Sequence, residues 1–440
     1  MSHTGKITFD FNWEDPRGAR GEELRATWAR LRILVDDDPV LKVEDIRTRS
    51  VRDYLYLPLY PLAEWMAVNW WFLLAEVGPS RAKDALGFSH RHNLRFAREG
   101  FALPNLSLVP TGETTQIEWS PVDLPGCEVS FLATGKANLD TEQVRDDFAR
   151  FIGAVAGRLD EKGLVGTTLQ TEWDAIQQTE TAEQEFCLTA AALGQDPYAL
   201  DHGVSEAILT AHETLPPETF QDFVQAADPT QLVNQANLLH QWIGDLQNTD
   251  FELGGLRDLR GGFQGRAANG TPWQQGYAAA GELRRHLQLG DRTNLRWEDL
   301  PAVLRVPPSE FKAAFQCHDD TDLLWLNAVA ASNRTGSPAL AIGKRHGDSA
   351  KFAFSRALFE YLTQPESSAC IVTSARSARQ QRNRAFAAEF LAPAGLIHAR
   401  LSGDHIYSDE VDDLATEFGV FSSVIRHQIE NHRLAEVESC

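Results

Sequence analysis

The sequence contains few cysteines and methionines for its length. Its 440 residues include five cysteines and two methionines, and no two cysteines form a CxxC pair. An odd number of widely spaced cysteines excludes a disulfide framework and a thiolate zinc site. The first residues, MSHTGKITFDFNWEDP, contain no apolar segment, so we expect no signal peptide and a cytoplasmic location.

Positive charge is also scarce. The chain has 41 Lys and Arg against 62 Asp and Glu, a formal net charge of −21. Neutralising nucleic-acid phosphates requires a basic surface, so the composition argues against a broad nucleic-acid binder and leaves a local basic patch open. The hydrophobic share of 43% with 23% charged residues is typical of a globular protein and excludes extensive disorder.

Long apolar runs without polar interruption are missing. The most apolar stretch, residues 54–74, is about long enough to span a membrane. It is interrupted by Pro58, Pro61, Glu64 and Asn69. We therefore expect no membrane span, and a buried aromatic helix that begins near Pro61.

The order of patterns along the chain predicts a helix-rich, multidomain α+β protein. We expect an N-terminal α+β domain of unknown role over residues 1–165 and a helical region over 166–253. Glycines and arginines crowd residues 254–272, which we interpret as a Gly-rich linker. Helical and strand patterns alternate again over 273–440.

One N-terminal helix is predicted in detail. Apolar residues recur on one face of the segment Thr141–Leu159. Asp140 and Gln143 have the spacing of a capping pair at its start.

Two motifs in the third region carry a family resemblance. They are KFAFSRALFEYL at 351–362 and NRAFAAEFLAPAGLI at 383–397. Over residues 273–434 the chain resembles the ImmA/IrrE family of zinc metallopeptidases, bacterial proteins that cleave repressors in stress and mobile-element regulation. The resemblance implies a zincin-like domain in which 351–362 forms the active-site helix.

The residues at the expected metal-binding positions depart from that family. An active member needs HExxH, in which two histidines one helical turn apart bind zinc and the glutamate activates water. Here those positions hold Arg356, Ala357 and Glu360, and the third ligand position falls on Gln380, or on Gln381 if the spacing slips. A guanidinium cannot bind zinc because it stays protonated. We therefore expect no metal, no zinc cofactor and no active metallopeptidase.

We name three candidate binding residues in the active-site cleft that the resemblance implies: Arg356, Glu360 and Glu389. The first two lie one helical turn apart and face the same side. They form either an ion pair that holds the cleft together or two solvated charges on an exposed face, and the sequence leaves both open.

The C-terminal segment, residues 408–432, has the spacing of a helix-turn-helix. If it bound DNA, Ser422, Ser423 and Arg426 would face the groove. The first of the two helices is strongly acidic, which opposes contact with phosphates.

Together these features predict a catalytically degenerate ImmA/IrrE-like protein. It would act through a protein partner as a binding or regulatory component in bacterial stress, mobile-element or phage-defence responses. One alternative is an active zinc-dependent endopeptidase with a non-standard site that cleaves a repressor or partner. Another is a transcription regulator that binds DNA through 408–432.

Overall fold

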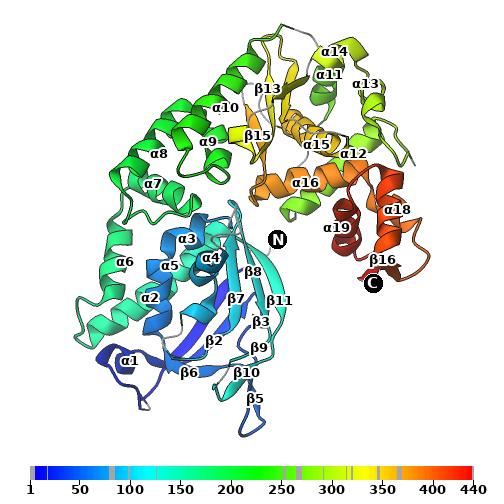
Figure 1. Ribbon diagram of the computed structural model, residues 1–440. Helices are drawn as coiled ribbons and strands as arrows, with labels where there is room; N and C mark the ends of the chain where they lie inside the picture. Colours follow the sequence, from blue (N-terminus) through cyan, green and yellow to red (C-terminus); the bar gives the residue numbers. More distant parts are fainter. Residues whose placement is uncertain are drawn as a thin grey trace. The chain divides into compact units, whose positions relative to one another are not determined.

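The chain divides into two compact units, unit 1 (Met1–Leu200) and unit 2 (Asp201–Cys440). The division falls inside the expected helical region 166–253 and not at its start (Figure 1). The computed structural model describes residues 5–16, 18–78, 85–97, 100–124, 126–250, 254–263, 270–290, 292–313, 315–318, 321–343, 347–363 and 369–438.

Unit 1 contains three antiparallel sheets, so the expected α+β character is confirmed here. The first sheet joins β1 (Ile7–Trp13), β2 (Trp28–Val35), β3 (Asp38–Pro39) and β6 (Leu55–Pro58). The second follows the order β5 (Val51–Arg52), β4 (Val43–Asp45), β10 (Val129–Phe131) and β9 (Val122–Asp123). The third follows the order β11 (Gly135–Asp140), β8 (Thr114–Ser120) and β7 (Asn105–Pro110).

Most of the apolar stretch 54–74 is helical in unit 1. That stretch forms β6 and two short helices, α2 (Tyr60–Val68) and α3 (Trp70–Ala75), which are largely buried in the core. In the described part of the chain no helix combines the length and hydropathy that a membrane span requires. The other helices are α1 (Glu22–Ala26), α4 (Ala85–His92), α5 (Thr141–Glu161), α6 (Thr168–Gln178) and α7 (Thr181–Ala192), with a 3₁₀ turn η2 (Leu94–Phe96).

The predicted helix after Asp140 is confirmed as α5. The Asp140 side chain caps it by accepting a hydrogen bond from the backbone N–H of Gln143 at 3.0 Å. Its predicted apolar face is buried, including Val144, Phe148 and Ile152. This face packs against the sheets and sets α5 beside strand β1.

Unit 2 places helices around a four-stranded sheet with the order β12 (Phe315–His318), β14 (Pro338–Gly343), β13 (Leu326–Ser332) and β15 (Cys370–Thr373). The pair β12–β14 is parallel and the other two pairs are antiparallel. The helices are α8 (His202–Thr214), α9 (Pro217–Val224), α10 (Leu232–Gln247), α11 (Gly254–Gly262), α12 (Pro272–His286), α13 (Leu300–Val303), α14 (Pro308–Ala313), α15 (Asp348–Thr363), α16 (Ala378–Leu391), α17 (Ala394–His398), α18 (Ser408–Phe418) and α19 (Ser422–His432). Short elements complete it: η3 (Trp297–Asp299), η4 (Thr321–Leu323), β16 (His405–Tyr407) and β17 (Glu436–Glu438).

The segment interpreted as a Gly-rich linker is helical in its first half. Residues 254–262 form α11, and residues 264–269 lie outside the described part. Leu256, Leu259 and Phe263 are 1%, 5% and 7% exposed. Their spacing of three and four residues places them on one helical face, and burial of that face outweighs the flexibility of the glycines.

Helix α16 packs against both α12 and α15. It packs against α15, which itself lies on strands β13, β14 and β15. It also packs closely along α12. A Cβ atom on Gly276 of α12 would come within 2.3 Å of the backbone oxygen of Arg382, so only glycine allows this approach.

We predict that Gly276→Ala destabilises unit 2 by about 1–3 kcal/mol, because the added methyl group forces α12 and α16 apart. Gly281→Ala on the same helix is the matched control, since nothing lies within 4 Å of its Cβ position. The control should be neutral or stabilising by up to about 1 kcal/mol, because alanine favours the helix. Urea unfolding of both variants measures the difference, and equal effects would contradict the packing argument.

Candidate functional site

The residues at the ligand positions that the resemblance implies lie together in a buried site between α15 and α16. Arg356 and Glu360 lie one turn apart on α15, where they are 5% and 1% exposed. Gln380 and Asn383 lie on the facing side of α16 and are fully buried. The interpretation of Arg356 and Glu360 as solvated charges is therefore wrong.

The Arg356 guanidinium donates hydrogen bonds to groups on α16 and β15. Its Nε donates to Asn383 Oδ1 at 2.6 Å. Its Nη2 donates to the backbone oxygen of Thr373 and to Gln380 Oε1, both at 2.8 Å. The side chain thus bridges α15, α16 and the end of β15.

Glu360 joins the same site through both carboxylate oxygens. Oε1 accepts from Asn383 Nδ2 at 2.9 Å, and Oε2 accepts from Arg379 Nε at 2.9 Å. Asn383 therefore links Arg356 to Glu360 with its amide oxygen and its amide nitrogen. The sequence left an ion pair between Arg356 and Glu360 open. In the structure the Asn383 amide connects the two side chains.

Gln380 bonds to the backbone of β15 as well as to the side chains of Arg356 and Asn383. Its Oε1 accepts from the N–H of Thr373 at 2.9 Å, and its Nε2 donates to the oxygen of Ile371 at 2.9 Å. Both bonds fasten α16 to strand β15. The alternative ligand Gln381 donates to the backbone oxygen of Arg376 at 2.8 Å and is partly exposed.

A fourth element, α9, contributes Asp222. The Thr219 hydroxyl anchors α9 to β15 by donating to the oxygen of Ala369 at 2.7 Å. Asp222, 4% exposed, then lies 3.0 Å from Nη1 of Arg379, so Asp222 and Glu360 share one guanidinium. We call Asp222, Arg356, Glu360, Arg379, Gln380 and Asn383 the buried polar network.

The charge balance of this network shifts the pKa of Asp222. Burial raises its pKa to about 6. The positive charge of Arg379 opposes that rise, and the neighbouring Glu360 carboxylate adds to it. Asp222 thus carries the least compensated negative charge of the site.

The residues of the network do not fit a zinc ion. Arg356 has no lone pair to offer, and the amide oxygens of Gln380 and Asn383 already accept from it. Ala357 is fully buried in the apolar core. Among the described residues no three His, Cys, Asp or Glu side chains are grouped so as to hold a metal ion.

A nucleophilic role is not supported at the nearby cysteine either. Cys370 on β15 is 1% exposed, and burial raises the pKa of its thiol to about 12. A thiol that stays protonated at neutral pH is a poor nucleophile.

The third candidate cleft residue, Glu389, lies on α16 but bonds elsewhere. Its Oε2 accepts from the backbone N–H of Ala394 at 3.1 Å and from Gln428 Nε2 at 2.7 Å. It therefore fastens α17 and α19 to α16, and its hydrogen bonds do not reach Arg356 or Glu360.

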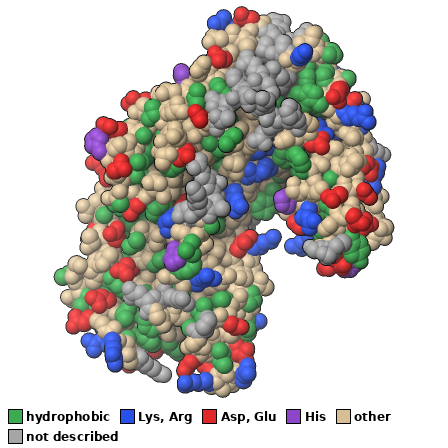
Figure 2. Space-filling view, in the orientation of Figure 1, with side chains coloured by type: hydrophobic (Ala, Val, Ile, Leu, Met, Phe, Trp, Pro, Cys, Tyr) green, Lys and Arg blue, Asp and Glu red, His purple; other side chains and the backbone are tan. Residues whose placement is uncertain are grey.

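The helix-turn-helix-like segment consists of two helices joined by a tight turn, and two of its three predicted DNA-contact residues are engaged within the segment. Gly419 turns the chain between α18 and α19 with φ of 61°. Ser422 hydrogen-bonds to the Asp412 carboxylate, and Arg426 donates to the hydroxyl of Ser408 at 3.4 Å. Two of the three predicted contact residues thus bond to α18, while Ser423 is exposed. On the face of the molecule that Figure 2 shows, Lys and Arg side chains are interspersed with Asp and Glu side chains.

Unit 1 has a buried ionic cluster of its own. Glu76 accepts from Arg91 Nε at 2.8 Å and lies 2.9 Å from His92 Nε2, while His92 Nδ1 lies 2.7 Å from the oxygen of Leu108. Burial acts to raise the pKa of Glu76, but the hydrogen bonds from Arg91 and His92 outweigh it and lower the pKa. These contacts tie α4 to β7 and to the end of α3.

Comparison with protein-family models, curated proteins and solved structures finds no match to this chain.

Sequence reasoning missed three residues of the network: Asp222, Arg379 and Asn383. Arg379 and Asn383 lie next to and three residues after Gln380, so a helix through this segment could have indicated both of them. No sequence pattern pointed to Asp222, because it lies on α9, which is distant in sequence from α15 and α16.

We predict that Arg356→Ala destabilises unit 2 by about 3 kcal/mol or more, because it leaves the buried acceptors on Asn383, Gln380 and Thr373 without their charged donor. The melting temperature of unit 2 should fall by roughly 6 °C or more, measured by calorimetry. The matched control is Arg400→Ala, which removes a half-exposed ion pair to Glu417 at 2.9 Å. It should lower the melting temperature by about 2 °C at most, and an equally small effect for Arg356→Ala would count against the network.

We predict a pH-dependent contribution from Asp222. Its pKa is raised above the unfolded value, so its stabilising effect is complete below about pH 4 and is lost as pH rises through about 6. The difference in unfolding free energy between wild type and Asp222→Asn should therefore change by roughly 2 kcal/mol between pH 4 and 7. Denaturant titrations at each pH measure it. Asp245→Asn, an exposed change on α10, should show a constant difference, and a constant difference for both refutes the prediction.

Proposed function

We propose that this chain is a catalytically degenerate relative of the ImmA/IrrE metallopeptidases that acts by binding. In this proposal it is a regulatory component of bacterial stress, mobile-element or phage-defence responses. The observation that carries the proposal is Arg356. It stands at the first ligand position of the resemblance, and its hydrogen bonds go to the residues that would otherwise surround a metal.

The packing of unit 2 supports the resemblance. The first motif lies on α15 and the second begins on α16, and these two helices pack against each other. An active-site helix that lies on the sheet and faces the FAAE helix is the arrangement that the proposal requires. The site between these two helices is filled by side chains of the chain itself.

The chemistry of the buried polar network argues for a structural role of these residues in place of metal binding. A buried charge network is seldom more stable than well-packed apolar residues, and it imposes one arrangement on the elements it joins. Here it fastens α9, α15, α16 and β15 together through charged and amide groups. Such a rigid body suits a protein that presents surfaces to a partner.

A protein partner fits the electrostatics better than nucleic acid. The chain carries a net charge of −21, which repels phosphates at long range. Residues Asp409, Glu410 and Asp413 of α18 are exposed where a DNA backbone would have to pass. We therefore favour binding to protein over transcriptional control by direct DNA contact.

The proposal predicts that the purified full-length chain contains less than about a tenth of an equivalent of zinc after incubation with zinc and extensive dialysis. Plasma mass spectrometry measures the metal directly. The physical reason is that the two carboxylates of the network, Glu360 and Asp222, already share the Arg379 guanidinium, and Glu360 also accepts from Asn383. Close to one equivalent of zinc would overturn the proposal.

Glu360→Gln is the matched control, because it keeps the shape of the side chain and removes the charge. Wild type and control should both lack zinc. Zinc that is present in wild type and lost in Glu360→Gln would mean that the network binds metal. Zinc retained in both would point to a metal site elsewhere and to the alternative of a non-standard zinc-dependent endopeptidase. Either result contradicts the proposed function.

A further inference from the structure

Strand β1 lies at the end of its sheet and has one free edge. Among the described residues it pairs only with β2, in antiparallel register from Ile7 opposite Val35 to Trp13 opposite Ala29. The N–H of Asp36 donates to the oxygen of Lys6 at 2.8 Å, so even-numbered residues of β1 point their backbone groups at β2. Since these groups alternate along an antiparallel strand, those of residues 7, 9, 11 and 13 point away from β2.

Only one N–H on this free edge is covered. The N–H of Ile7 donates to Asp147 Oδ2 of α5 at 3.0 Å. In the described part of the chain the N–H groups of Phe9, Phe11 and Trp13 have no acceptor. These three residues are partly exposed and not buried, so the edge is open. Three N–H donors at alternate positions form the template to which another strand can pair.

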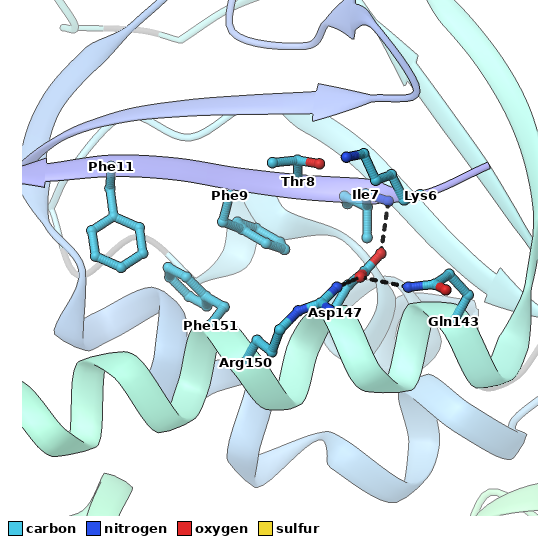
Figure 3. Close-up of a pocket in the computed structure, with 9 residues that line it drawn as sticks. All are labelled: Lys6, Ile7, Thr8, Phe9, Phe11, Gln143, Asp147, Arg150 and Phe151. Atoms are coloured by element: carbon cyan, nitrogen blue, oxygen red, sulfur yellow. Dashed lines mark hydrogen bonds and ion pairs between the residues drawn. The ribbon is translucent and has the colours of Figure 1, made fainter. Parts of the chain in front are cut away.

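A groove lies along this edge, between β1 and α5. Its volume is about 510 Å³, within the range of peptide and ligand sites, and residues of both elements line it. Figure 3 shows Phe9 and Phe11 projecting from β1 toward Phe151 of α5. Phe9 stacks on Phe151 at 4.5 Å between ring centroids, and Phe11 meets the same ring edge-on at 6.0 Å. The wall of the groove beside the free edge is therefore aromatic.

The available charge in the groove is positive. Asp147 is 1% exposed, and its carboxylate already accepts from the N–H of Ile7, from Gln143 and from Arg150. Arg150 is 69% exposed. A carboxylate of a ligand can therefore reach the Arg150 guanidinium. A cation cannot pair with Asp147 in the same way, because that carboxylate is buried and already hydrogen-bonded.

We propose that an extended segment of a partner protein adds to β1 as a new strand at this free edge. Its alternate side chains would be apolar and contact Phe9, Phe11 and Phe151. One carboxylate side chain would contact Arg150. Strand addition of this kind takes its affinity from backbone hydrogen bonds and its specificity from side-chain pockets at alternate positions. The proposal concerns unit 1 and does not depend on the metallopeptidase resemblance of unit 2.

The charge argues for a partner segment over a second copy of this chain. If two β1 strands paired at their free edges, the side chains entering the groove would be Ile7, Phe9, Phe11 and Trp13 of the other copy. None of these carries a carboxylate for Arg150. A partner with an acidic residue in an apolar, alternating stretch satisfies both the aromatic wall and the guanidinium.

The test begins with a phage-displayed library of random octapeptides selected on the full-length chain. We expect enrichment of peptides with apolar residues at alternate positions and at least one Asp or Glu. A fluorescent copy of a selected peptide then measures affinity by anisotropy. Arg150→Ala should weaken binding about fivefold, because an exposed charge pair is lost. Arg145→Ala is the matched control on the same helix, 47% exposed and paired with Asp146, and should bind as wild type does.

A second pair of variants tests the backbone edge itself. Phe11→Pro removes one free N–H and leaves the hydrogen bonds to β2 in place, since residue 11 does not pair with β2 through its N–H. We expect at least tenfold weaker binding. Phe11→Leu keeps the N–H and the apolar surface and should stay within about threefold of wild type. Amide exchange should show protection of residues 7–13 when the peptide binds.

Several outcomes overturn the proposal. One is the absence of any enriched peptide, and another is equal binding of the selected peptide to wild type, Arg150→Ala and Phe11→Pro. Exchange protection confined to other segments also contradicts it. A dimer in sedimentation that Phe11→Pro converts to a monomer would assign the edge to a second copy of the chain.

Discussion

The interior of unit 2 depends on neutralising a guanidinium that is buried where the family resemblance places a metal ligand. Arg356 cannot lose its proton, so each element around it must supply an acceptor. Asn383, Gln380 and the backbone of Thr373 do so at 2.6–2.8 Å. The positions of α15, α16 and β15 relative to one another follow from these bonds.

A second guanidinium extends the same constraint outward. Arg379 serves both Glu360 and Asp222, which brings α9 into the site and leaves two carboxylates on one cation. The site therefore has equal numbers of buried positive and negative groups, with Asp222 the least satisfied of them. A zinc ion would be one more positive charge among groups that already balance. This electrostatic balance is the argument on which the proposed binding role is based.

Unit 1 satisfies its backbone in a different way. Its sheets are antiparallel, and α5 covers part of one edge through the single bond from Ile7 to Asp147. The same helix contributes Phe151 and Arg150 to the groove beside the uncovered part. One helix thus both closes the start of the edge and shapes the surface next to the rest, which is why the groove is aromatic and cationic in an otherwise acidic chain.

Local patterns in the sequence were sufficient for some of these features. The apolar face of α5 and its cap at Asp140 follow from residues a few positions apart. That positions 356 and 360, where the resemblance implies zinc-binding histidines, hold Arg and Glu is likewise read directly from the sequence. Tertiary structure decided the rest. The burial of Glu360, the bridge through Asn383, the arrival of Asp222 and the helix at 254–262 depend on which surfaces pack together. Helical and strand periodicity shows which face of an element is buried, and it carries no information about the distant element that will cover that face.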